Sequence, residues 1–198
     1  MKKNKTIIAA FILLLIAFIG GTVAYLTDTD SQQNVFTLGN IDITLTEPNW
    51  VAANAQNIMP GAVIAKDPKI NNVGTAGAYV FIKVEEPCYN GNKLFTYTAD
   101  SAWAVVGSAG TCSGNGLATA TTVYGYEANG EMNELAASAS TSSLFSNVTL
   151  SSALTSADIT GITTALGNDD LEIVVTGYGI QSTGLGTTTP ATVWANFS

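Results

Sequence analysis

The residues that could carry enzymatic chemistry in this chain are few and poorly arranged. The sequence contains no histidine, which excludes a Ser-His-Asp triad, a Cys-His pair and a histidine-based zinc motif. Without a histidine base, Cys88 is a poor candidate for a nucleophile. Glu85 and Glu86 are adjacent, and neighbours on a strand point to opposite faces, so they cannot act as a carboxylate pair. The sequence therefore predicts a protein that is not an enzyme and has no cofactor.

Two acidic clusters look like fragments of calcium-binding loops, namely Asp28-x-Asp30 and Asp169-Asp170-x-Glu172. Neither has the glycine and the twelfth-position glutamate of a complete loop. We interpret them as solvated turn acids, and leave a Ca²⁺ site there as the open alternative. Gly177-x-Gly179 lies inside a predicted strand, where paired glycines indicate a bulge or a close approach rather than a nucleotide site. Aromatic residues in the strands are interpreted as core rather than as a sugar-binding platform.

The first two dozen residues have the order of regions found in a secretory signal peptide. Lys2, Lys3 and Lys5 precede an uncharged apolar run, and Gly20-Gly21-Thr22-Val23-Ala24 follows it. This pattern predicts a cleaved signal peptide over residues 1–24. The alternative is a retained anchor, because residues 7–24 just reach membrane-spanning length.

Cleavage is expected between Ala24 and Tyr25, give or take one residue, because Thr22 and Ala24 supply the small side chains before the cut. N-terminal sequencing of the exported protein checks this. Retention of residues 1–19 would contradict both the signal peptide and the assembly described below.

The charge of the remaining chain excludes several partners. Removal of residues 1–24 leaves four lysines against fifteen acidic residues, a net charge of −11. Such a chain lacks the cations needed to bind nucleic acid phosphates, and anionic lipid surfaces repel it. Contact with a membrane is therefore expected only before signal cleavage. The two cysteines, Cys88 and Cys112, are predicted to form one disulfide in an oxidising compartment.

Alternation of apolar and polar residues with a period of two dominates the rest of the chain. It predicts strands rather than helices, over 40–46, 78–85, 103–106, 121–126, 146–150, 171–181 and 192–197. Turn signals separate them, among them Asn90-Gly91 and Asn129-Gly130. Residues 156–166 have helical spacing, with Ser156 as the expected cap. Residues 88–144 are predicted to form long loops with two or three strands.

These elements predict an all-β fold, an antiparallel jelly-roll-like β-sandwich with long loops and one short helix. Within the strand 78–85, Ala78, Val80, Ile82 and Val84 are expected to face the core. Tyr79, Phe81, Lys83 and Glu85 are then expected to face outward.

Three blocks of the sequence resemble the TasA/camelysin family. The first runs from Gly20-Gly21-Thr22-Val23-Ala24-Tyr25-Leu26-Thr27-Asp28 into Val35-Phe36-Thr37-Leu38-Gly39-Asn40-Ile41-Asp42-Ile43-Thr44-Leu45. The second joins Met59-Pro60-Gly61 to Asn71-Asn72-Val73-Gly74, and the third is Val175-Thr176-Gly177-Tyr178-Gly179-Ile180-Gln181 with Trp194 downstream. The middle of the chain, about 87–170, does not match.

The resemblance implies a jelly-roll subunit of extracellular biofilm matrix fibres, exported with the help of a dedicated SipW-type signal peptidase. In such fibres an N-terminal strand completes the sheet of the neighbouring subunit. The expected partners are other copies of this chain, the signal peptidase and other matrix proteins, outside a Gram-positive-type bacterium. Camelysin members of the family are described as metalloproteases, an activity that the absence of histidine speaks against here.

The division of the chain that follows is a signal peptide over 1–24, a donor segment over 25–34 and a sandwich domain over 35–198. On a strand, Tyr25, Thr27, Thr29 and Ser31 would share an uncharged face, with Leu26, Asp28 and Asp30 on the other. Such a segment can add to an open sheet edge through backbone hydrogen bonds. The alternatives are a monomeric cell-surface adhesin or binding module and, less favoured, a camelysin-type protease.

Overall fold

The computed structural model describes residues 39–107, 109–168, 170–185 and 188–197. From Gly39 onwards the chain forms one compact unit. The predicted signal peptide, its cleavage site at Ala24 and Tyr25, and the donor segment 25–34 lie outside the described residues, as does Asp169.

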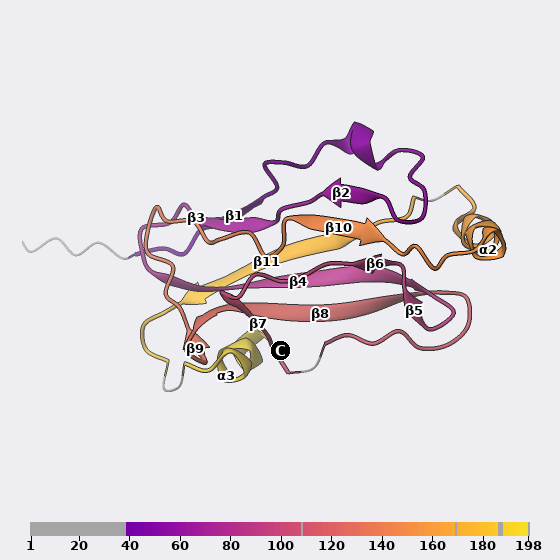
Figure 1. Ribbon diagram of the computed structural model, residues 1–198. Coiled ribbons are helices and arrows are strands. Elements are labelled where there is room, and N and C mark those ends of the chain that lie inside the picture. Colours follow the sequence, from indigo (N-terminus) through magenta and orange to yellow (C-terminus); the bar gives the residue numbers. More distant parts are fainter. Residues whose placement is uncertain (1–38, 108, 169, 186–187, 198) are drawn as a thin grey trace, which may run out of the picture. The chain divides into compact units, whose positions relative to one another are not determined.

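The predicted all-β antiparallel sandwich is confirmed. Two layers of strands face each other in Figure 1. One layer is a six-stranded sheet in the order β11-β4-β8-β7, with β5 and β9 at its ends, and the other combines the pair β1-β3 with β2-β10-β6. The strands are β1 (Ile43–Thr46), β2 (Val63–Ala65), β3 (Lys69–Asn72), β4 (Ala78–Tyr89), β5 (Asn92–Lys93), β6 (Phe95–Thr96), β7 (Trp103–Val105), β8 (Leu117–Ala128), β9 (Glu131–Met132), β10 (Asn147–Leu150) and β11 (Val174–Gln181).

The main core lies between the two layers. Val80, Ile82 and Val84 of β4 are fully buried there, and Ile64, Ile70 and Val148 reach them from the other layer. The inward face of β4 is therefore the predicted one. Burial of these large aliphatic side chains is the main favourable term in the stability of the sandwich.

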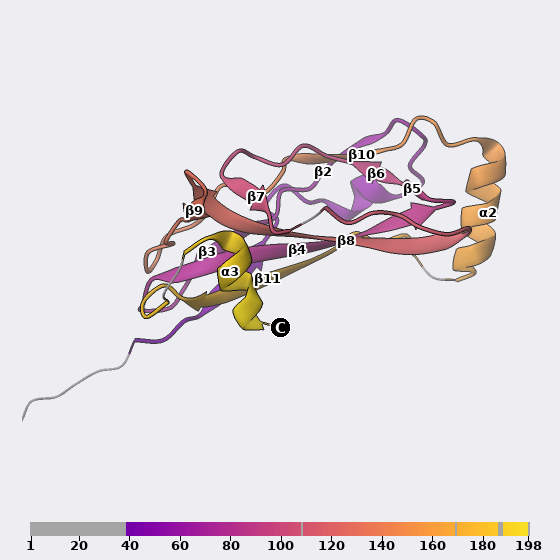
Figure 2. The ribbon, with the colours of Figure 1, turned by 90° about the horizontal axis from the view of Figure 1, so that it is seen from below.

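The outward face of β4 differs from the prediction, because Tyr79 and Phe81 are buried as well. Helix α3 (Pro190–Trp194) and the 3-10 helix η2 (Ala195–Phe197) cover this end of the six-stranded sheet (Figure 2). The Trp194 ring lies 5.1 Å from that of Phe81. A covered second face lets β4 carry large apolar residues at consecutive positions.

The predicted strand over 192–197 is wrong, since these residues are helical. Pro190 occupies a first-turn position, where its fixed φ favours a helix and its missing N–H costs nothing. The helix over 156–166 is confirmed as α2 (Ser156–Leu166), but its cap is Thr155 and not Ser156. Thr155 and Asp158 form a reciprocal capping box, and the hydrogen bonds from Thr155 lower the pKa of Asp158.

The middle of the chain is more ordered than predicted. The described part of residues 88–144 contains the five strands β5 to β9, against the two or three expected. Two of the predicted turns are present as hairpin turns, with Asn90 and Gly91 at φ 49° and 77° and Asn129 and Gly130 at 57° and 86°. Two successive positive φ angles give the turn whose twist matches antiparallel strands. The short 3-10 helix η1 (Ala52–Ala55) lies in the β1–β2 connection.

A disulfide joins Cys88 at the end of β4 to Cys112 in the connection between β7 and β8, with Cα atoms 5.8 Å apart. We expect replacement of both cysteines by alanine to lower the free energy of unfolding by about 3 kcal/mol, because the bridge restricts the unfolded chain. Denaturant unfolding measures this, and reduction should add two hydrogens to the intact mass. Labelling of both thiols in the native protein would contradict the bridge.

Within the described residues, neither α-helix is long and apolar enough to cross a membrane.

Candidate functional site

The free edge of β11 is the most distinctive surface of the sandwich. Strand β11 is the terminal strand of the six-stranded sheet, and β4 is its only partner among the described strands. The Ser182 N–H donates to the Gly77 carbonyl (3.2 Å), so by antiparallel alternation the even-numbered residues of β11 bond to β4. The odd-numbered residues turn their N–H and C=O groups away from the sheet, and no described residue bonds to them: Val175, Gly177, Gly179 and Gln181.

This edge lacks the features that protect free edges in monomeric proteins. Such edges carry charges, proline or a bulge, or they are very short. Strand β11 has the sequence Val-Val-Thr-Gly-Tyr-Gly-Ile-Gln and keeps an unbroken register with β4 over eight residues. The other terminal strands, β1, β2, β3, β6 and β7, have two to four residues each. Among the described strands, β11 therefore offers the longest template for an added strand.

Gly179 lets strand β1 lie close against the inner face of β11. A Cβ atom added at Gly179 would lie 3.1 Å from Ile43 Cγ2, and one at Gly177 would lie 3.4 Å from Leu45 Cδ1. The predicted close approach is thus confirmed at Gly179, whereas the contact at Gly177 would be an ordinary van der Waals contact. Because β1 already covers this face, a strand that joined β11 would extend the sheet at its edge rather than enter the core.

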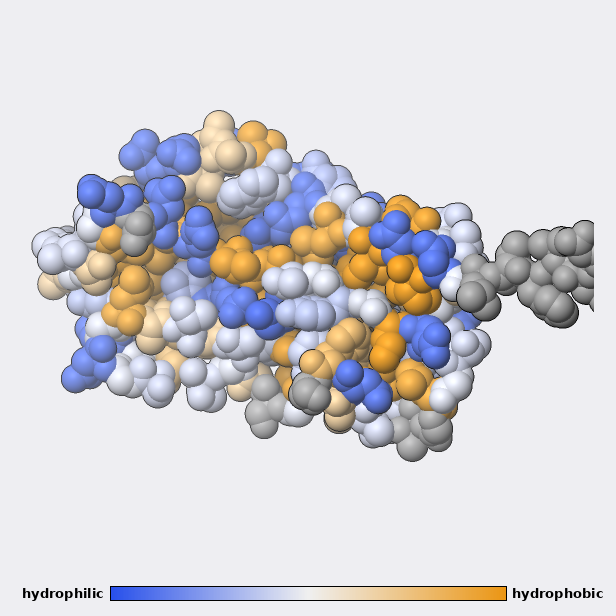
Figure 3. Space-filling model, turned by 180° about the vertical axis from the view of Figure 1, so that it is seen from behind, coloured by the Kyte–Doolittle hydropathy of each residue, from blue (hydrophilic) through white to orange (hydrophobic). Residues whose placement is uncertain are grey.

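Two hollows flank the beginning of β11, one on each face of the sheet. The inner cleft, about 540 Å³, is lined by core residues such as Ile64 and Phe95 and by Leu171 and Ile173. The outer groove, about 310 Å³, includes Leu117 and Val174, which are 37% and 44% exposed. Figure 3 shows the side of the molecule on which β11 lies, with several apolar patches between polar ones. Apolar side chains of an incoming segment can be buried in both hollows.

Two charged residues on the outer face beside β11 compensate each other. Lys83 and Glu85 of β4 form an ion pair of 2.9 Å, opposite Thr176 and Val174 of β11. The hydrogen bond to Glu85 raises the pKa of Lys83, so the lysine stays charged at neutral pH. The pair is therefore neutral, and the net charge beside the edge is that of the acidic residues that line the hollows at the beginning of β11.

The two adjacent glutamates point to opposite faces, as the sequence predicts. Glu85 is half-buried, whereas Glu86 is fully buried and paired with Lys93 of β5. One Glu86 carboxylate oxygen, Oε2, has no hydrogen-bond partner among the described residues. Sequence reasoning missed this buried pair, because the short strand β5 that brings Lys93 to Glu86 has no periodic pattern.

The predicted site residues are distributed as follows. Cys88 and Cys112 are joined, while Asp170 and Glu172 line the hollows at the beginning of β11. The free edge itself was not predicted, since a strand pattern does not reveal which of its two sides is paired. The absence of charged residues over the eight residues of β11 was the one sequence feature that could have indicated an edge suited to pairing.

One comparison with known proteins gives a match. The family model described as camelysin metallo-endopeptidase matches residues 1–85, which reaches into β4. No curated protein and no solved structure matches the chain.

The family description implies a metal, and the residues of this chain do not fit one. Protein zinc sites are built from histidine, cysteine and carboxylate ligands, but the chain has no histidine and both cysteines are in the disulfide. In the described part of the chain, no three side chains of these types come together.

Proposed function

We propose that this chain, which belongs to the TasA/camelysin family, is a non-enzymatic structural subunit of extracellular biofilm matrix fibres. In this proposal, residues 25–34 of one copy pair with the free edge of β11 in the next copy. The observation that carries the proposal is the unguarded eight-residue edge, a surface that pairs readily with another strand.

The donor segment and the edge have matching lengths. A strand rises about 3.3 Å per residue, so the eight residues of β11 span about 26 Å and the ten residues of the segment about 33 Å. One face of the segment, with Tyr25, Thr27 and Thr29, carries no charge. Neither strand therefore brings an unpaired charge into the new pairing on that face.

The two hollows beside β11 give the segment places for its large apolar side chains. Tyr25 and Leu26 are neighbours and on a strand point to opposite faces of the sheet. One can occupy the inner cleft and the other the outer groove. Backbone hydrogen bonds then supply most of the affinity, and these two side chains fix the register.

Assembly of this kind takes place outside the cell. The proposal includes export through a SipW-type signal peptidase, release of the new N-terminus at Tyr25, and a location in the matrix or at the surface of a Gram-positive-type bacterium. Other copies of the chain are the main partner, and other matrix proteins are additional ones.

A peptide experiment tests the proposed pairing. A synthetic peptide of residues 25–34 is titrated into protein that begins at Val35, and binding is followed by calorimetry. We expect saturable binding, and weaker binding of a peptide with Thr27→Asp and Thr29→Asp. Absence of binding, or equal binding of a scrambled peptide, contradicts the proposal.

The family description favours a protease as the second candidate. A casein assay with and without a chelator separates the two functions. If the protein is a structural subunit, we expect no cleavage of casein in either condition. Cleavage by the pure protein that the chelator abolishes would establish protease activity.

A further inference from the structure

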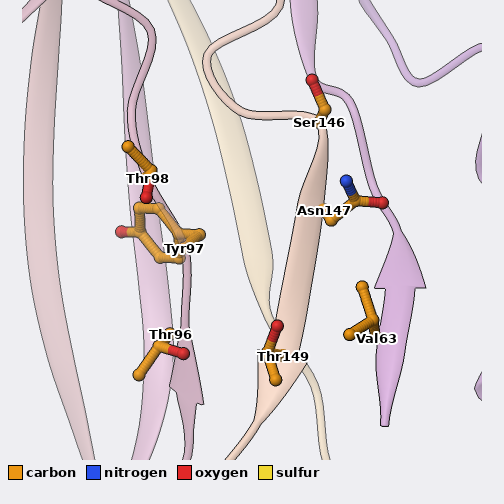
Figure 4. A pocket seen from close by; sticks show the side chains of 7 residues that line it. All are labelled: Val63, Thr96, Tyr97, Thr98, Ser146, Asn147 and Thr149. Atoms are coloured by element: carbon orange, nitrogen blue, oxygen red, sulfur yellow. The ribbon is translucent and has the colours of Figure 1, made fainter.

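A third hollow lies on the other layer, away from β11. Strands β2, β10 and β6 and the residues after β6 surround a groove of about 460 Å³. Its polar side chains stand on two walls in Figure 4, with Thr96 and Thr98 on one side and Asn147 and Thr149 on the other. Ser146 lies at one end.

The groove exists because two strands separate. Strands β6 and β10 pair only at Phe95–Leu150 and Thr96–Thr149, and their chains next meet where Asp100 N–H donates to the Leu144 carbonyl (2.7 Å). Between these points residues 97–99 form no backbone pairs with residues 145–148. The Tyr97 and Phe145 rings, 4.4 Å apart, fill the space below. The opening is thus built on the core and does not depend on a loose loop.

The polar side chains of the groove have no hydrogen-bond partners among the described residues. This holds for Thr96, Thr98, Ser146, Asn147 and Thr149. The opposite end of the same layer behaves differently, because Asn71 donates to Thr46 (3.1 Å) and accepts from Ser140 (2.7 Å). Five converging donors and acceptors that do not satisfy one another are available to a ligand.

The groove carries no charge. None of its lining residues is charged at neutral pH, and burial, followed by the hydrogen bond with Tyr124, raises the pKa of Tyr97 further from neutrality. The chain as a whole has a net charge of −8, which repels anionic ligands. The chemistry of the walls and the charge of the protein therefore both favour a neutral, hydrogen-bonding ligand.

We infer that this groove is a binding site for neutral carbohydrate. Sugar hydroxyls both donate and accept hydrogen bonds, as do the threonine and serine hydroxyls and the Asn147 amide of the walls. The Tyr97 ring and the exposed methyl groups of Val63 offer contacts for the C–H faces of a sugar ring. This inference does not depend on strand donation, because the groove and the β11 edge belong to different layers.

Calorimetric titration of the full chain with three neutral hexasaccharides tests the inference: cellohexaose, maltohexaose and the hexamer of N-acetylglucosamine. Polygalacturonate serves as the anionic comparison. We expect at least one neutral hexasaccharide to bind and polygalacturonate not to bind. Thr98→Val and Asn147→Ala should each weaken binding about fivefold to tenfold, because each removes one or two hydrogen bonds.

Thr121→Val is the matched control, since Thr121 is an exposed threonine of β8 in the opposite sheet. The Thr121→Val variant should bind each hexasaccharide with the same affinity as the unchanged protein. The inference is overturned if none of the three hexasaccharides binds, if the groove variants bind as well as the control, or if polygalacturonate binds as tightly as the neutral sugars.

Discussion

Removal of residues 25–34 is expected to abolish fibre formation and to leave a folded monomer. The strands of the sandwich lie at 43–181, so a protein that begins at Val35 keeps every described strand pair and the whole core. Its circular dichroism and thermal unfolding should match those of the unassembled longer protein. What it loses is the segment that we propose to pair with β11.

Substitutions on the two faces of the segment provide the control for this deletion. Thr27→Asp and Thr29→Asp should also prevent assembly, because each places an unpaired carboxylate against the neighbouring subunit, at a cost of about 1–3 kcal/mol or more. Asp28→Asn and Asp30→Asn on the other face should be tolerated, since they reduce repulsion between acidic subunits. Fibres from the protein that begins at Val35, or equal effects on the two faces, would contradict strand donation.

Val175→Pro in β11 is expected to prevent polymerisation while the monomer still folds. The Val175 N–H points to the free edge and has no partner in the described chain. Proline at such a position removes no hydrogen bond of the monomer, but it removes a donor from the template and places its ring where the incoming strand must lie. Electron microscopy should show fibres for the unchanged protein and none for this variant.

Val175→Ala is the matched control, because it loses the packing of the half-buried valine and keeps the N–H. Both variants should lower the free energy of unfolding by similar amounts, about 1 kcal/mol for the lost apolar contacts, as measured by denaturant unfolding. Only the proline variant should fail to assemble. Assembly of Val175→Pro at the normal rate would exclude the β11 edge as the acceptor.

The strands with strong alternation were predictable because one face of each lies against the core. Strand β4 shows what alternation predicts correctly and what it misses. The inward residues follow from the pattern, but the burial of Phe81 depends on a helix more than a hundred residues later in the chain. Tertiary contacts of this kind leave no local signal. The same contacts explain the error at 192–197, where Val193, Trp194 and Phe197 pack on β4 and β11 as helical residues.

In the candidate site, too, some features follow from local residue types and others depend on tertiary structure. The uncharged face of residues 25–34 and the glycine pair at 177 and 179 can be read directly from residue types. The free edge cannot, since the hydrogen-bonding partner of each side of a strand is set by the topology of the whole sheet. The carbohydrate groove arises where β6 and β10 separate over Tyr97 and Phe145, and no local pattern predicts a separation of strands.

The most direct test of the fibre proposal is electron microscopy of the complete exported protein that begins at Tyr25, purified without denaturant and imaged over a range of concentrations. Strand donation predicts ordered filaments whose amount increases with protein concentration. Uniform monomers at every concentration, with the fold intact by circular dichroism, would contradict it.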